Sequence, residues 1–237
     1  MSQVGFEILR CFETSDDALV LRRYMANWKF VDLITSRFLY FAPASEFSDT
    51  LEGHYTHRDG ELSDRQLARW GLDDRARAVA ADARTRIAKS NRKAVVICCW
   101  TAGRDEDHRM WSEYGRSSDA MAFETTVGHL RRALGSDFLI VPVTYLDFSR
   151  QTIPKDHSLQ PFFFKQLCFA WEREVRVVGE MEVGKCIESP RLLPIDLASI
   201  FQKVIVSPFA SAKYRVAVES RLSAASLSIP VHDSGLR

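Results

Sequence analysis

Short motifs that mark the common nucleotide-binding and hydrolytic sites are missing from this sequence. The patterns G-x-G-x-x-G, G-x-x-x-x-G-K-S/T, H-E-x-x-H and G-x-S-x-G do not occur. Their absence argues against a Rossmann dinucleotide site, a P-loop, a zincin-type protease and an α/β-hydrolase. Any chemistry must therefore come from residues that are scattered along the chain.

Long apolar runs and a dominant charge are also missing. No stretch approaches about eighteen consecutive apolar residues, so no membrane-spanning helix is expected. The first residues, MSQVGFEILR, do not resemble a signal peptide, and we expect a cytoplasmic protein. The net charge of +1 excludes a global field that would recruit nucleic acid or an anionic membrane.

Cysteine and histidine do not form the spacings of a metal site. No C-x-x-C pair occurs, and only His54 and His57 lie close together among the six histidines. A zinc site needs further ligands at short spacings, so no metal is expected. Reduced, buried thiols are the expected state of the five cysteines, which are Cys11, Cys98, Cys99, Cys168 and Cys186.

The composition is that of an ordinary globular protein, with 46% hydrophobic and 27% charged residues in 237. We expect one domain over 1–237. Strands and helices alternate without regular βαβ spacing, which predicts an α+β fold with a mixed, largely antiparallel sheet and flanking helices. A short strand followed by a helix is predicted within 19–37. Further strands are predicted at 38–42, 95–101, 121–124, 138–146, 175–178, 201–206 and 229–234, and further helices at 63–93, 105–115, 125–135, 160–172 and 211–227.

Residues 63–93 form a basic insert that is rich in alanine and arginine. It contains nine Lys or Arg and four Asp, a local net charge of +5. The simpler interpretation is one or two helices outside the sheet with a solvated face. The alternative is an arm that contacts phosphates.

The segment Trp171-Glu172-Arg173-Glu174-Val175-Arg176 has the most chemical content. Two glutamates that are two apart at the mouth of a strand point to the same side. In a cleft, one carboxylate could stabilise a developing positive charge while the other orients a nucleophile, and each raises the pKa of the other. The alternative is a strand edge whose Glu and Arg side chains pair in solvent.

Two aromatic residues, Trp111 and Tyr114, are three apart and share one face of the short helix predicted at 105–115. Core packing is the common reason for such a pair, and a platform on which a flat ring stacks is the alternative.

Seven segments in shared order resemble a bacterial family catalogued as the domain of unknown function 2971. They are Leu21-Arg22-Arg23-Tyr24-Met25, FLYFAPASEFSDTLEG, Cys99-Trp100, MWSEY, VTYLD, KQLCFAWEREVR and VIVSPFAS. The similarity spans about residues 20–235. Arg22 replaces the usual aromatic residue, and Thr50 replaces the usual proline of the loop.

The order of these motifs is similar to that of the ADP-ribosyltransferase superfamily, in which a first strand bears His or Arg and a late strand bears E-x-E. This resemblance implies a related fold and NAD as substrate, with ADP-ribose transferred to a protein or nucleic acid acceptor by a toxin or phage-defence effector. It implies Glu174 as the principal carboxylate, which Glu174→Gln would inactivate with the fold intact, and Glu172 as the residue that orients the acceptor. The implied NAD contacts are Arg23 on the pyrophosphate, in a common cleft with Glu174, and the aromatic residues Tyr24, Phe41, Trp111 and Tyr114.

Two other functions stay open from the sequence. One is a non-enzymatic module of a defence system that binds nucleic acid through 63–93. The other is a nuclease in which four carboxylates hold a divalent metal such as magnesium, which prefers oxygen ligands. Those carboxylates would be Asp49, Glu52, Glu172 and Glu174.

Overall fold

The computed structural model describes residues 9–115, 118–180 and 191–236, and its largest element is a nine-stranded sheet. Every strand pair of this sheet is antiparallel except the last two strands, β10 and β11. The strands are β1 (Val20–Ala26), β2 (Phe38–Pro43), β3 (Val95–Ala102), β4 (Ala120–Thr126), β5 (Phe138–Pro142), β8 (Glu174–Glu180), β9 (Arg191–Pro194), β10 (Lys203–Val206) and β11 (Val231–Asp233).

Strand β3 lies at the centre of the sheet, as the apolar run VVICCWT predicts. One of its edges pairs with β8 from Val95 to Thr101, and β8 in turn pairs with β5. The other edge is shared, because β2 pairs near Val96 and β1 pairs near Thr101. From β1 the order continues through β4 and β10 to β11, and β9 extends the branch that begins with β2.

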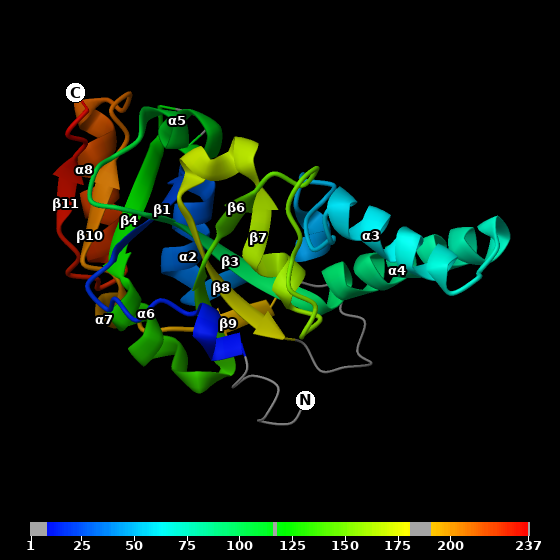
Figure 1. Cartoon of the computed structure of the whole chain (residues 1–237). Helices are drawn as coiled ribbons and strands as arrows, with labels where there is room; N and C mark the ends of the chain where they lie inside the picture. Colours follow the sequence, from blue (N-terminus) through cyan, green and yellow to red (C-terminus); the bar gives the residue numbers. More distant parts are fainter. Residues whose placement is uncertain (1–8, 116–117, 181–190, 237) are drawn as a thin grey trace.

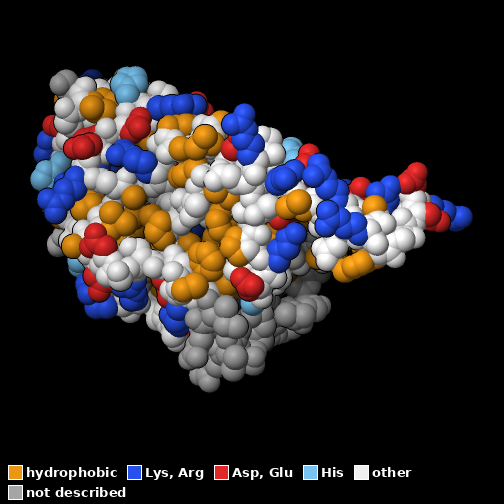
Figure 2. Space-filling view, in the orientation of Figure 1, with side chains coloured by type: hydrophobic (Ala, Val, Ile, Leu, Met, Phe, Trp, Pro, Cys, Tyr) orange, Lys and Arg blue, Asp and Glu red, His pale blue; other side chains and the backbone are white. Residues whose placement is uncertain are grey.

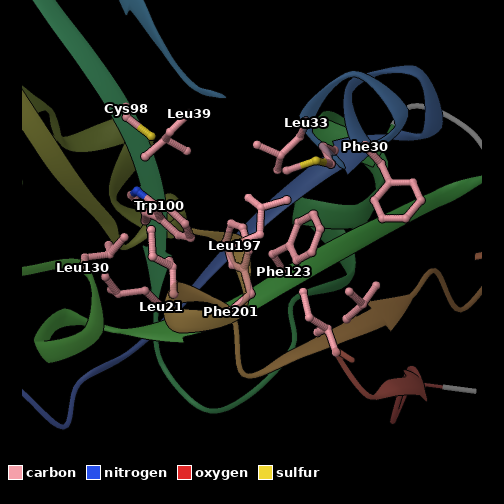
Figure 3. Close-up of a cluster of buried hydrophobic side chains, with 14 of the residues drawn as sticks. Leu21, Phe30, Leu33, Leu39, Cys98, Trp100, Phe123, Leu130, Leu197 and Phe201 are labelled. Carbon is pink, nitrogen blue, oxygen red and sulfur yellow. The ribbon is translucent and has the colours of Figure 1, made fainter. Parts of the chain in front are cut away.

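Four helices cover one face of the sheet and bury the main apolar core (Figures 1 and 3). They are α2 (Asn27–Ser36), α6 (Val127–Leu134), α7 (Leu197–Ile200) and α8 (Ala212–Ala224). In helix α2 the apolar residues Phe30, Leu33 and Ile34 recur at helical spacing, so they lie on one face, and all three are buried in this core.

The opposite face of the sheet is covered by shorter elements. They are α5 (His108–Met110), the π-helical turn Trp111–Gly115, and a two-stranded parallel sheet of β6 (Thr144–Leu146) and β7 (Phe164–Gln166). Two smaller apolar clusters lie here, one around Phe162 and Phe163 and one around Tyr24 and Trp111. Several charged side chains are buried on this face, and they form the candidate site described below.

A helical hairpin of α3 (His57–Arg69) and α4 (Asp74–Ala94) projects away from the sheet (Figure 1). At the start of α3, the side chain of Thr56 and that of Asp59 each accept the other residue's backbone N–H, which completes a capping box. The structure describes all of α4, and none of its residues is buried. The basic insert is therefore helical, as predicted, although its first helix begins at His57.

The mixed, largely antiparallel sheet with flanking helices confirms the predicted α+β class. The helix predicted at 160–172 is wrong, because this segment forms two 3-10 turns on either side of β7. Its three consecutive phenylalanines, 162–164, are all buried, and β7 pairs with β6. The strand predicted at 138–146 breaks after Pro142, and β9 and α7 were not predicted.

Among the residues that the structure describes, no helix is long and apolar enough to cross a membrane. The cysteines within the described ranges form no disulfide bond, but the expectation that they are buried is wrong for Cys11 and Cys168, which are exposed. Cys98 is buried, Cys99 is partly buried, and Cys186 lies outside the described residues.

The loop after β2 depends on Gly53, and this generates a stability prediction. Gly53 has a φ of +69°, and a Cβ there would lie 2.3 Å from Cε1 of Phe162. We expect Gly53→Ala to lower the free energy of unfolding by about 2–4 kcal/mol, from left-handed strain and overpacking together. Urea unfolding measures this loss.

Gly71→Ala is the matched control, because Gly71 has a φ of +82° but a Cβ there would meet nothing within 4 Å. It should cost only the conformational part, about 1 kcal/mol. Equal losses in the two variants would contradict the close approach of Phe162 to Gly53.

Candidate functional site

The site is built around Arg176, a guanidinium on β8 with an exposed fraction of 0%. Its two terminal nitrogens donate to the two carboxylate oxygens of Glu52 at 2.6 and 2.8 Å, and its Nε donates to Oε1 of Glu174 at 2.8 Å. One terminal nitrogen also donates to the carbonyl oxygen of Phe162 at 2.7 Å. A buried charge needs such partners, because transfer out of water is costly.

Lys165 on β7 extends this network to a second glutamate. Its Nζ lies 2.5 Å from Oε2 of Glu172 and 3.2 Å from Oε2 of Glu174. The hydroxyl of Tyr114 donates to the other oxygen of Glu172 at 3.0 Å. Glu172 is only 5% exposed whereas Tyr114 is 43% exposed, so Tyr114 connects the buried charges with the surface.

Glu172 and Glu174 point to the same side, as the sequence predicts, but the alternation of side chains along a strand is not the whole reason. Glu172 ends a 3-10 turn and Glu174 begins β8. Arg173 between them has a φ of 45°, an uncommon left-handed conformation for a residue with a side chain. This bend turns both carboxylates toward Lys165. The alternative of solvated Glu–Arg pairs at a strand edge is wrong for Glu172, Glu174 and Arg176, which are all buried.

The protonation of the two glutamates differs because their neighbours differ. Burial raises the pKa of Glu174, but the charges of Arg176 and Lys165 outweigh burial and lower the pKa to about 2. Burial raises the pKa of Glu172, and Lys165 only partly opposes it. Burial and the two glutamates also raise the pKa of Tyr114. Glu172 is therefore the carboxylate of this pair that accepts a proton more readily.

The sheet register separates Arg23 from the glutamates, so the expected common cleft of Arg23 and Glu174 is wrong. Arg22 on β1 faces Thr101 on β3, and Thr101 faces Glu174 on β8, so these three side chains share a face. Arg23 points to the other face, where its guanidinium lies 5.9 Å from the ring centre of Trp100.

Phe41 is likewise a core residue on the face away from the glutamates. It is fully buried and stacks on Phe138 with 4.9 Å between ring centres. Tyr24 and Trp111 lie on the face of the glutamates, but they pack edge to face at 4.8 Å. Trp111 is only 1% exposed and donates its Nε1 proton to Glu106. Of the predicted aromatic ligand contacts, only Tyr114 joins the network, and core packing accounts for the others.

Arg22, which the sequence did not single out as a ligand contact, lines a cavity on the face of the glutamates. The cavity has a volume of about 270 Å³, and Val20, Arg104, Glu124 and Lys203 complete its lining. Arg22 donates from Nε to Oε2 of Glu124 at 2.9 Å, and Lys203 lies 2.9 Å from Oε1 of the same glutamate. Three cations against one carboxylate give this cavity a positive character.

The structure does not favour the four carboxylates proposed as metal ligands. Glu52, Glu172 and Glu174 already pair with Arg176 or Lys165. Asp49 instead accepts the backbone N–H of Leu51 at 2.9 Å. Within the described ranges, no group of three or more His, Cys, Asp or Glu residues has the arrangement of a metal site.

Comparison of the chain with protein-family models, with curated proteins and with solved structures found no match.

The buried network generates a prediction about Glu174→Gln. Both oxygens of Glu174 accept hydrogen bonds from buried cations. We therefore expect this change to destabilise the fold, in place of the earlier expectation that the fold stays intact. We expect a loss of about 3–5 kcal/mol in the free energy of unfolding, because Arg176 and Lys165 lose a charged partner. Urea unfolding measures it, with Glu61→Gln as the control.

Glu61 pairs with Arg58 at 2.9 Å on the surface, with both side chains at least one third exposed. The control should therefore lose no more than about 1 kcal/mol. A Glu174→Gln protein as stable as the control would contradict a structural role for this carboxylate.

A second prediction concerns acid. The pKa of Glu174 is about 2 in the folded protein and 4.5 ordinarily, so its stabilising effect is complete above pH 4.5 and is lost as the pH falls toward 2. We expect Glu174 to account for up to about 3 kcal/mol of acid destabilisation. Urea unfolding at a series of pH values should show a shallower acid dependence in Glu174→Gln than in the wild type, and parallel curves would contradict the depressed pKa.

Proposed function

We propose that this chain is an ADP-ribosyltransferase-like enzyme that cleaves NAD and transfers ADP-ribose to a macromolecular acceptor in the cytoplasm. Membership in the family of domain 2971 and an ADP-ribosyltransferase-like fold are part of the proposal. The observation that carries it is the Tyr114–Glu172 pair, which leads from the surface to a buried carboxylate whose pKa is raised by burial.

The chemistry of transfer suits this pair. The bond between nicotinamide and ribose breaks, and its electron pair leaves with nicotinamide. The nucleophile of the acceptor then bonds to the same ribose carbon and gives up a proton. Glu172 is suited to take that proton, because its raised pKa brings it closer to the pH at which a general base works best. Tyr114 is the group through which Glu172 meets the substrate.

Glu174 takes a positioning role in this proposal, in place of the principal catalytic role. Its low pKa keeps it charged, and its charge is directed at Arg176 and Lys165. Lys165 in turn contacts Glu172 at 2.5 Å, so Glu174 helps to fix the carboxylate that reacts. Arg176, which pairs with both Glu52 and Glu174, holds Glu174 in place.

Arg22 replaces Arg23 as the residue proposed to hold the pyrophosphate of NAD. Arg22 and Glu174 are separated by β3 alone, so their backbones lie about 10 Å apart across the sheet. Arg104 and Lys203 line the same cavity and add positive charge. A guanidinium suits this role because it can bind phosphate oxygens in pairs.

The test is release of nicotinamide from NAD, followed by chromatography, with and without added protein or nucleic acid. We expect Glu172→Gln to lower the acceptor-dependent rate about a hundredfold or more, because the base that takes the acceptor's proton is lost while the volume is kept. Tyr114→Phe should lower it by a similar factor, because the hydroxyl is the group through which Glu172 meets the substrate. Glu113→Gln and Tyr55→Phe are the matched surface controls and should retain the wild-type rate.

Thermal melting of each variant separates lost chemistry from lost folding. Wild-type protein that neither binds NAD in calorimetry nor releases nicotinamide would overturn the proposal. Cleavage of DNA or RNA that depends on added magnesium and is abolished by Glu172→Gln would assign the site to a nuclease instead.

A further inference from the structure

The hairpin of α3 and α4 is basic although the whole chain is nearly neutral. Residues 57–94 contain ten Lys or Arg and six Asp or Glu, a local net charge of +4 in a chain of net charge +1. Figure 2 shows Lys and Arg side chains along the projecting arm. The excess of positive charge is therefore concentrated on the part of the molecule that stands furthest from the sheet.

Several acidic residues of the hairpin are already neutralised by contacts that build it. Arg77 on α4 reaches Asp64 on α3 at 2.9 Å and Asp74 at 2.5 Å. Asp59 is buried at the base, where Lys155 lies 3.2 Å away. By contrast, six basic side chains of the hairpin form no ion pair with any described residue, namely Arg65, Arg69, Arg75, Arg84, Arg86 and Lys89.

The contact between Arg77 and Asp64 defines the two faces of α4. Each residue of an α-helix turns by about 100°, so Arg86, nine residues after Arg77, points directly away from α3. The stripe on this outer face contains four basic residues and one acidic residue, and all of its members are exposed: Arg75, Val79, Asp82, Arg86, Lys89 and Lys93. From Arg75 to Lys93 it is about 27 Å long.

The base of the hairpin is fixed to the body, so the stripe is held in one direction. Arg92 near the end of α4 donates to the backbone carbonyl oxygens of Ala44, Phe47, Asp49 and Thr50. These residues belong to the loop that carries Glu52. Because one helix holds these cations in a row, less freedom is lost on binding than with cations on a flexible segment.

We propose that the outer face of α4 binds the phosphodiester backbone of duplex nucleic acid. The cations of the stripe are spread over about 27 Å of one helix, which is long enough to meet several phosphates of a backbone, and arginines such as Arg75 and Arg86 bind phosphate oxygens in pairs. Binding to the backbone alone needs no bases to be read, so it is independent of sequence. The proposal does not depend on the proposed NAD chemistry.

Charge and shape favour nucleic acid over the other occupants. A helix that lies on a membrane carries a broad apolar face, whereas the outer stripe of α4 contains Val79 as its one apolar residue. A second copy of the chain would bring the same basic stripe into contact with itself, and like charges would repel.

The experiment measures fluorescence anisotropy of a labelled duplex of about 20 base pairs, as DNA and as RNA, with the full chain. Binding is expected at about 50 mM salt and should weaken steeply as salt is added, since each phosphate contact releases counterions. The double variant R75Q/R86Q should bind at least tenfold more weakly, and its salt slope should be smaller by about 2.

The matched control is R132Q/K213Q, which removes the same charge from exposed positions on α6 and α8. It should bind as the wild type does, and thermal melting should find both double variants folded. Three outcomes would overturn the proposal. They are no binding at low salt, an equal loss in the two double variants, and binding to vesicles that contain phosphatidylserine but not to either duplex.

Discussion

Arg176 is a permanent positive charge in a position from which water is excluded, and much of the local structure follows from that constraint. An unpaired guanidinium there would be costly, so carboxylates must reach it from elements that are far apart in the sequence. Glu52 arrives from the loop after β2, where Gly53 lets Phe162 approach closely, and Glu174 arrives from the start of β8. Lys165 pairs with both Glu174 and Glu172, and among the described residues Tyr114 links Glu172 to the surface. A requirement for charge balance therefore positions the loop, two strands and the candidate site together.

The two faces of the sheet differ in polarity because the network of buried charges lies on one of them. One face is apolar and is sealed by α2, α6, α7 and α8, and it supplies most of the hydrophobic stabilisation. Within the described residues, the other face carries two smaller apolar clusters, with buried charges between them. The Arg22 cavity and the glutamate network share this second face, which explains why a ligand that contacts both is the basis of the proposed function. The basic hairpin is attached through Arg92 to the loop that carries Glu52, so its orientation is coupled to the same network.

The alternation of side chains along each strand decides which of the predicted site residues lie on the same face of the sheet. Arg22 and Arg23 are neighbours with the same side chain, and neither composition nor motif order distinguishes them. In a strand, consecutive side chains point to opposite faces, so a difference of one residue separates the core from the site. The register Arg22–Thr101–Glu174 settles this separation in favour of Arg22, and it depends on pairing across three strands. The sequence does not place Phe41 on one face either, because an aromatic residue in a strand suits the core and a ligand platform equally.

The sequence by itself determined the α+β class, the central strand β3, the basic helices of the hairpin and the nearness of Glu172 to Glu174. These features depend on local periodicity, on charge density and on residues close in the chain, all of which are visible without a fold. Tertiary structure alone decided that Arg176 joins Glu52 to Glu174 and that Lys165 joins Glu174 to Glu172. It also decided that Arg23 and Phe41 lie on the opposite face, that Tyr24 and Trp111 pack against each other, and that the pKa of Glu174 is lowered while burial raises that of Glu172. The physical reason is that burial and the distance between charges set protonation and pairing. Both quantities exist only after strands far apart in the sequence have come together.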